Sequence, residues 1–118
     1  MPPFRQQIEI GPPDGPRSQR ILALVDPASA YSVMPAAALT MVGLEPQWTQ
    51  GFQLAAGGVE ERQMAEIKVR LEGPARTTVC VFGGTESEPV LGKHTLDAFG
   101  LAFDGDEENL VPVRFDLG

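Results

Sequence analysis

The acid best placed for chemistry is Asp26. It ends the apolar run Leu22–Val25 and is followed by the small residues Pro27–Ala30, before the chain turns apolar again at Val33. Carboxylates can serve as general acids or bases, but an isolated Asp after an apolar run is by itself weak evidence for such a role. An Asp followed by proline is also a good N-cap and first-turn pair, so the same residues are compatible with the start of a helix. Pro35 would fit badly inside such a helix.

Other reactive side chains give weaker signals. His94 is the only histidine and lies in a short helical pattern, where a solvated side chain is typical. Cys80 alternates with valines, which predicts a buried or half-buried thiol rather than a nucleophile, because no histidine lies nearby in the sequence to activate it. A single cysteine also rules out an intrachain disulfide framework and a cysteine zinc cluster. Ser29 and Ser32 lack a Lys or His base at a recognisable spacing, which argues against a serine hydrolase.

An acidic cluster near the C-terminus raises the question of a metal site. Its members surround Gly105 and are Asp104, Asp106, Glu107 and Glu108. Because the spacing of a calcium-binding EF-hand loop is absent, we interpret the cluster as a solvated turn. We expect no metal and no cofactor.

Composition and charge exclude several functional classes. The chain has 118 residues, enough for one domain with a modest core, so we expect a single domain over residues 1–118. The net charge of −7 argues against a nucleic-acid partner, which needs clustered Lys and Arg. No apolar run approaches the roughly 20 residues of a membrane helix, and the start of the chain lacks a signal-peptide layout. We therefore expect no membrane partner and a cytoplasmic protein.

Strand patterns dominate the chain. Apolar and charged residues alternate from Glu66 to Glu72, which predicts a half-buried strand. The β-branched and aromatic segment Thr77–Phe82 predicts a second strand, and Gly73-Pro74 predicts the turn that joins them into a hairpin. The segment from Phe52 to Glu60 predicts strand, glycine tip and strand.

The remaining elements are shorter. Further strands are expected at Phe4–Ile10, Arg20–Val25 and Leu110–Phe115. Pro35–Gly43 opens with proline and ends in glycine, which predicts about two helical turns. Lys93–Phe99, followed by another glycine, predicts a second short helix. These elements together form a small, mostly β domain that would carry Asp26.

Two segments resemble the retropepsin-like aspartic proteases. ALVDPASAYSVMP is similar to their active-site segment, which is typically an apolar strand, then Asp-Thr-Gly-Ala-Ser, then Ser-Val-Leu-Pro. PVLGKHTLDAFGLAFDGDEENLVPV resembles the later part of those chains, in which two apolar residues and a glycine precede a short helix. Order and spacing agree along nearly the whole chain, including a glycine-tipped hairpin between the two segments.

The resemblance implies a fold and a site. The fold would be a closed antiparallel β-barrel of the acid protease (retropepsin) type with one or two short helices. Asp26 would be the catalytic acid, and Pro27, Ala28 and Ser29 would form the active-site loop. The hairpin tip would be a substrate-binding flap and consists of Ala55, Ala56, Gly57 and Gly58. Because one such chain supplies one acid, the resemblance implies a homodimer acting on a peptide or protein substrate.

The resemblance also implies the reaction. Two carboxylates about 3 Å apart cannot both ionise, so two Asp26 side chains, one from each chain, would share a proton. The ionised member would take a proton from the water that attacks the peptide carbonyl, while the protonated member polarises that carbonyl. The titration then belongs to the pair rather than to either residue.

Four positions after Asp26 depart from the family pattern. The residue after the acid is normally Thr or Ser, whose hydroxyl and backbone N–H bond across the dimer interface, whereas Pro27 has neither group. Ala28 replaces a glycine, which adds a methyl group and penalises any positive φ. Ser29 and Ala30 stand where Ala-Ser is usual. Three interpretations stay open: a peptidase of reduced activity, an inactive protease-fold module for peptide binding or dimerisation, and an engineered inactive variant.

Overall fold

The computed structural model describes residues 4–85 and 87–118. Within these residues the chain is mostly β, with nine strands and two short helices. The strands are β1 Arg5–Gly11, β2 Gln19–Val25, β3 Ser32–Met34, β4 Trp48–Gln53, β5 Val59–Arg70, β6 Ala75–Phe82, β7 Val90–Leu91, β8 Leu101–Asp104 and β9 Asn109–Pro112. The helices are α1 Ala36–Met41 and α2 Lys93–Ala98. In the described part of the chain, neither helix has the length and apolar character needed to cross a membrane.

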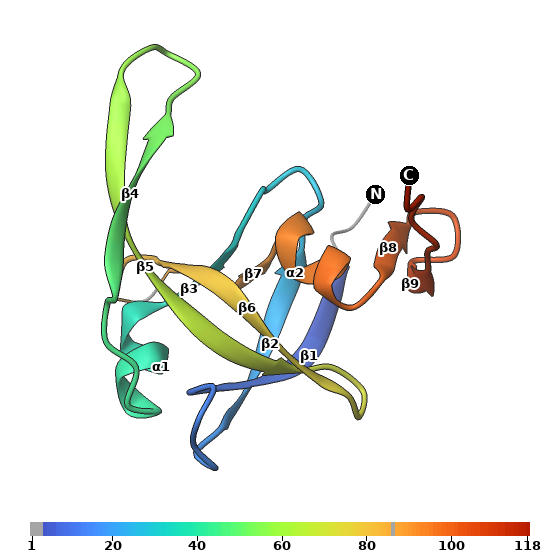
Figure 1. Ribbon diagram of the computed structural model, residues 1–118, viewed down its shortest axis with the longest axis horizontal. Helices are drawn as coiled ribbons and strands as arrows, with labels where there is room; N and C mark the ends of the chain where they lie inside the picture. Colours follow the sequence, from blue (N-terminus) through green and yellow to red (C-terminus); the bar gives the residue numbers. More distant parts are fainter. Residues whose placement is uncertain (1–3, 86) are drawn as a thin grey trace.

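The main sheet runs in the order β1-β2-β7-β3-β6-β5-β4. β1 also pairs with β5, which links the strands into a ring in the order β1, β2, β7, β3, β6 and β5. β4 lies outside this ring as an edge strand. In Figure 1 these strands form the body of the molecule, and the β4–β5 hairpin projects from it as a long arm. β8 and β9 form a separate two-stranded sheet.

The main sheet is mostly antiparallel, as the resemblance implies, but it also contains two parallel pairs that were not predicted. β2 pairs with β7 in parallel, and β3 pairs with β6 in parallel. A parallel pair needs a long crossover connection, and here α1 and the β4–β5 hairpin supply the one between β3 and β6. The three residues of β3 and the two of β7 are too few to show a periodic pattern, so the sequence did not predict these strands.

The predicted β5–β6 hairpin is confirmed. Along β5 the side chains of Ile67 and Val69 are fully buried, while Glu66 and Arg70 are exposed, as the alternating sequence predicts. Gly73, with a φ of 114°, lies in the turn to β6, where its lack of a Cβ makes this conformation accessible. One face of the hairpin therefore belongs to the core and the other faces solvent.

The core lies inside the ring of strands. Its residues come from every strand of the ring and from both helices. The helices are too short to be stable alone, so apolar contacts with the core stabilise them. The buried members are Ile8, Ile10, Ala23, Val25, Met34, Ala38, Leu39, Val42, Leu44, Ala65, Ile67, Val69, Leu71, Cys80, Phe82, Leu91 and Leu96.

The remaining predicted helices and strands are confirmed, with changes at their ends. α1 begins after Pro35 and α2 begins after Gly92, close to the predicted limits. The predicted strand Leu110–Phe115 is shorter, because β9 ends at Pro112, which has no N–H to donate to a neighbouring strand. The hairpin predicted over residues 52–60 forms between β4 and β5.

Candidate active site

Asp26 directly follows β2, at a point where three segments of the chain meet. Its backbone N–H donates to the carbonyl of Leu91 in β7 at 3.1 Å, next to the parallel pair of Val25 and Leu91. The N–H of Val25 donates to the carbonyl of Phe4 at 2.9 Å. Because backbone hydrogen bonds hold this strand end on both sides, the sheet fixes the position of Asp26.

The Asp26 loop, residues 26–31, forms a tight turn rather than a helix. The N–H of Ser29 donates to the Asp26 carbonyl at 3.1 Å, and the N–H of Ala28 donates to Asp26 Oδ1 at 3.0 Å. The alternative that Asp26 begins a helix is therefore wrong. Ala28 carries no conformational penalty, because positive φ at non-glycine positions is confined, in residues 4–85 and 87–118, to Glu72 and Glu108.

The far side of this loop is bound to the start of α2. The carbonyl of Ser29 accepts a hydrogen bond from the N–H of Lys93 at 2.8 Å, and the carbonyl of Ala30 accepts one from His94 at 2.9 Å. The first N–H groups of a helix have no partner within it, so these loop carbonyls satisfy two of them. A Cβ at Gly92 would come within 2.4 Å of the backbone of Tyr31, so the loop and the helix touch through a glycine.

A buried group of hydroxyls lies beneath the loop. The side chains of Ser32, Thr78 and Thr95 are all buried, from β3, β6 and α2. Ser32 Oγ and Thr95 Oγ1 are 2.6 Å apart, and Thr78 Oγ1 is 3.3 Å from Thr95 Oγ1. The N–H of Gly92 donates to Ser32 Oγ at 3.0 Å. This network ties the elements on both sides of Asp26 to the core.

A mostly apolar cavity of about 280 Å³ lies between the Asp26 loop and the β4–β5 hairpin. It is lined by residues from the loop, β3, the hairpin and β6: Ser29, Ala30, Tyr31, Val33, Phe52, Leu54, Glu60, Arg62 and Val81. No sequence pattern marks Tyr31 or the hairpin arms as cavity residues. Their signal is spatial, because residues far apart in the chain meet at this cavity.

The predicted flap tip is exposed and does not itself line this cavity. The tip residues are Ala55, Ala56, Gly57 and Gly58, and all four are exposed. The turn is closed by the N–H of Leu54 donating to the Gly58 carbonyl at 3.1 Å. The glycine-tipped hairpin was predicted correctly, but the arms below the tip provide the cavity wall.

Comparison with known proteins identifies the fold. No protein-family model matches this chain, and no curated protein matches it. A solved structure does match: the solution structure of the simian foamy virus (mac) protease, with a TM-score of 0.58 and 14% sequence identity. The chain has a retroviral protease fold. The match covers 79% of this chain and 91% of that protein, and an identity this low shows a shared fold and no more.

In this retroviral protease fold, Pro27 lies beside a second apolar hollow, of about 270 Å³. Pro27 is exposed and borders it together with α2, β8 and the C-terminal segment; the other lining residues are Lys93, Leu96, Asp97, Leu101, Ala102, Phe103, Val113 and Phe115. Phe115, which lines this hollow, is 56% exposed, and Leu117, two residues further along the chain, is 97% exposed. The Asp26 loop therefore borders both the hairpin cavity and this apolar hollow.

The other reactive side chains have structural explanations. His94 is exposed, and its ring lies 5.3 Å from that of Tyr31. Cys80 is fully buried in β6, and this burial raises the pKa of its thiol to about 12, which keeps it protonated and unreactive. Asp104 Oδ1 accepts the N–H of Asp106 at 3.0 Å, which makes the acidic cluster the turn between β8 and β9. No group of three metal-ligating side chains occurs among the described residues.

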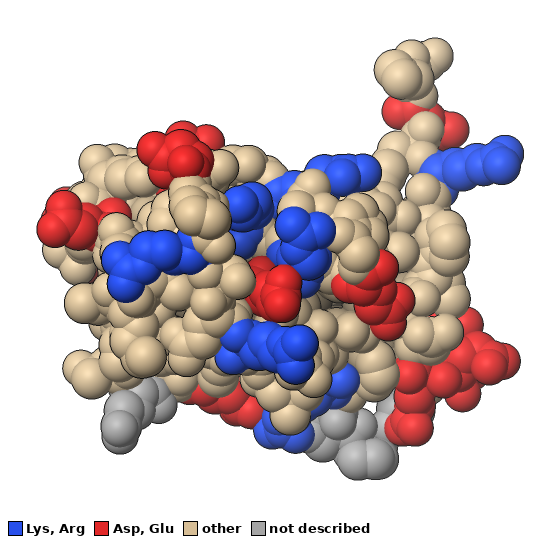
Figure 2. Space-filling model, turned by 90° about the horizontal axis from the view of Figure 1, so that it is seen from below, with Lys and Arg blue, Asp and Glu red and all other residues tan. Residues whose placement is uncertain are grey.

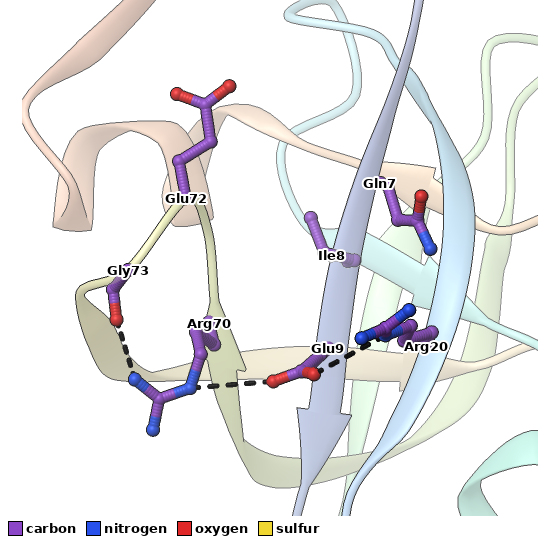
Figure 3. Close-up of a pocket in the computed structure, with 7 residues that line it drawn as sticks. All are labelled: Gln7, Ile8, Glu9, Arg20, Arg70, Glu72 and Gly73. Carbon is purple, nitrogen blue, oxygen red and sulfur yellow. Dashed lines mark hydrogen bonds and ion pairs between the residues drawn. The ribbon is translucent and has the colours of Figure 1, made fainter.

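A third cavity, of about 270 Å³, has several charged side chains in its lining (Figure 3). Glu9 lies between Arg20 and Arg70, with N–O distances of 3.7 and 3.4 Å. Both arginines stand directly opposite Glu9 in the strand register, so these are cross-strand pairs that link β2, β1 and β5. Figure 2 shows basic and acidic side chains interspersed over one face of the molecule. Strand pairing alone explains why Glu9, Arg20 and Arg70 lie together in this cavity, so no ligand is needed to account for them.

Proposed function

We propose that this protein is a retropepsin-like aspartic endopeptidase that works as a homodimer, with Asp26 as the catalytic residue of each chain. The observation that carries the proposal is the setting of this acid. Its carboxylate is oriented by the N–H of Ala28 at the end of a sheet strand, in a loop that borders an apolar cavity next to a hairpin arm. The retroviral protease fold supports the same assignment.

A second copy is proposed because one chain brings one such acid. Pro27 and Phe115 border the same apolar hollow, and burying exposed apolar surface of this kind favours association. A two-fold axis beside this loop would place each Asp26 against its own copy, because an isologous interface uses the same patch on both subunits. The chain, residues 1–118, acts as one domain in this assembly.

The reaction follows from the paired acids. The ionised Asp26 takes a proton from a water, whose oxygen forms a bond to the carbonyl carbon of the peptide. The protonated Asp26 of the other chain donates its proton to the carbonyl oxygen. Collapse of this tetrahedral species breaks the C–N bond: the nitrogen receives the proton that the first Asp26 took from water, and a hydroxyl on the former carbonyl carbon returns a proton to the other Asp26. The products are a carboxylic acid and an amine, and the pair again holds one proton. Pro27, Ala28 and Ser29 form the active-site loop. The hairpin tip, Ala55–Gly58, covers an extended peptide substrate.

One observation favours the inactive protease-fold module as a second candidate. Pro27 has neither an N–H nor a hydroxyl, so it removes both donors expected at the centre of the dimer. A loosely joined dimer would misplace the two acids, since catalytic groups need geometry held to about 0.5 Å. The protein would then keep the cavity and bind peptides without cutting them.

A cleavage assay separates the two candidates. Wild-type protein is incubated with a peptide library at mildly acid pH, with and without pepstatin, beside the Asp26→Asn variant. Asp14→Asn, in an exposed loop, is the matched control. Cleavage that pepstatin inhibits, that Asp26→Asn abolishes and that Asp14→Asn retains supports the endopeptidase. Cleavage that survives in Asp26→Asn overturns it, and a dimeric wild type without cleavage supports the inactive module.

A further inference from the structure

The side chain of Tyr31 joins the Asp26 loop to the hairpin and to α2. Its ring meets that of Phe52 in β4 edge-on, with ring centres 5.8 Å apart and planes at 82°. Its hydroxyl accepts a hydrogen bond from Gln50 Nε2, which at 3.4 Å is long and weak. On its other side the ring tilts against His94 at 5.3 Å. The aromatic contacts, more than the hydrogen bond, connect the three elements.

The backbone of Tyr31 is fixed while its side chain reaches outward. Its carbonyl accepts a hydrogen bond from Ser29 Oγ at 2.8 Å, and its backbone packs directly against Gly92. The next residue, Ser32, is buried and pairs with Cys80 in β6. The backbone of Tyr31 is therefore held in place, and its side chain projects from a fixed point at the end of the Asp26 loop.

The hairpin has few other supports in the described structure. β4 is the last strand in the sheet order and pairs with β5 alone, and the hairpin projects away from the body (Figure 1). Hairpins with little buried surface open locally at low free energy. A contact from the Asp26 loop to the middle of β4 is therefore well placed to restrict the position of the whole arm.

We propose that Tyr31 is the positioning residue that holds the β4–β5 hairpin against the Asp26 loop and thereby sets the width of the cavity between them. The consequence for catalysis rests on the proposed function, but the positioning itself does not. Tyr31 and Phe52 both line this cavity and contact each other there, so a change in their contact alters how a substrate side chain fits.

Hydrogen exchange measured by mass spectrometry tests the positioning without any assay of activity. In Tyr31→Leu, which keeps an apolar side chain but removes the ring, amides of residues 48–62 should exchange roughly three- to tenfold faster, because an aromatic pair contributes on this scale. Tyr31→Phe should exchange like the wild type. Phe103→Leu is the matched control, since Phe103 stacks on Phe4 at 5.5 Å outside the hairpin, and it should leave the hairpin amides unchanged.

Phe52→Leu tests the same contact from the other side and keeps the proposal testable should Tyr31→Leu fail to fold. It should raise hairpin exchange to the same extent, and the double variant should add little more, since both changes remove one contact. Unchanged hairpin exchange in Phe52→Leu or in folded Tyr31→Leu overturns the proposal. The same holds for faster exchange of equal size in Phe103→Leu.

Where the wild type cleaves peptides, kinetics provide a second readout. Tyr31→Leu should raise KM about tenfold with a smaller effect on kcat, since it loosens substrate fit without touching Asp26, and Tyr31→Phe should restore KM. Equal losses in kcat and KM that Phe does not rescue count against positioning. A wild type that cleaves nothing contradicts the proposed function alone, because hydrogen exchange still decides the role of Tyr31.

Discussion

The backbone N–H of Ala28 donates a hydrogen bond to Oδ1 of Asp26, with 3.0 Å between the nitrogen and the oxygen. Every residue except proline has this N–H, so an alanine at position 28 serves the acid as a glycine would. The proline stands one position earlier, where its missing N–H plays no part in this contact. In the proposed dimer, the departures from the retropepsin pattern would therefore affect what the loop presents to the second chain more than how it orients its own acid.

The double variant Pro27→Thr, Ala28→Gly should bind its own copy more tightly than the wild type. Each chain regains two donors, so a symmetric dimer gains up to four hydrogen bonds. At about 1 kcal/mol for each net hydrogen bond, the dimer Kd is expected to fall about a thousandfold. Sedimentation equilibrium over a concentration series measures this Kd. Ala28→Gly alone is the control and should leave the Kd unchanged; equal affinities of double variant and wild type would contradict the argument.

Gly92→Ala should destabilise the protein strongly. The new Cβ would lie 2.4 Å from the carbonyl carbon and oxygen of Tyr31, which are backbone atoms that cannot rotate away. Forcing the start of α2 away from the Asp26 loop is expected to lower the free energy of unfolding by about 3 kcal/mol. Urea denaturation measures the change. Gly84→Ala, where a Cβ meets no atom within 4 Å, is the matched control, and a similar loss in both variants would refute the steric explanation.

Thr95→Val should show how much the buried hydroxyl network contributes. The substitution keeps the shape of the side chain but leaves Ser32 Oγ and Thr78 Oγ1 without their shared partner. The free energy of unfolding should fall by about 1–3 kcal/mol, the cost of leaving buried polar groups unsatisfied. Thr40→Val, at an exposed position of α1, should change stability by less than about 0.5 kcal/mol. Thermal or urea unfolding without a difference between the two variants would show that the network is energetically neutral.

The sequence predicts best where a pattern repeats over many residues. The alternation from Glu66 to Glu72 and the Gly73-Pro74 turn predict β5, β6 and the hairpin that joins them, and the structure confirms all three. β3 and β7 are too short to carry a period, and their pairing is with strands distant in the chain. Parallel pairing in the sheet was consequently missed.

The candidate site also contains residues that the sequence predicts and residues that it does not. Asp26 was predicted because the segment around it and a later segment together resemble retropepsin-like proteases, and the hairpin tip was predicted because glycines tolerate a tight turn. Tyr31 gives no such signal. Its contacts with Phe52 and His94 exist only because the fold brings the loop, the hairpin and α2 together. Local patterns thus predicted the residues of the turn, but not the residue that joins it to the arm.

The buried thiol of Cys80 gives a prediction about pH. Burial raises the pKa of Cys80 in the folded protein to about 12, whereas its ordinary value is 9.0. The folded state therefore retains the proton after the unfolded state has lost it. The stabilisation is complete below pH 9 and is lost between pH 9 and 12, where the free energy of unfolding should fall by up to about 1.4 kcal/mol for each pH unit.

Cys80→Ala isolates this effect, because it removes the thiol and leaves every other titrating group in place. The cavity it creates should make the variant less stable at pH 7 by about 1–2 kcal/mol. Its stability should then decline less steeply than that of the wild type above pH 9. Urea unfolding at half-unit intervals from pH 7 to pH 10.5 provides both curves, and their difference isolates the thiol. Parallel curves over this range would mean that Cys80 ionises as easily in the folded protein as in the unfolded chain.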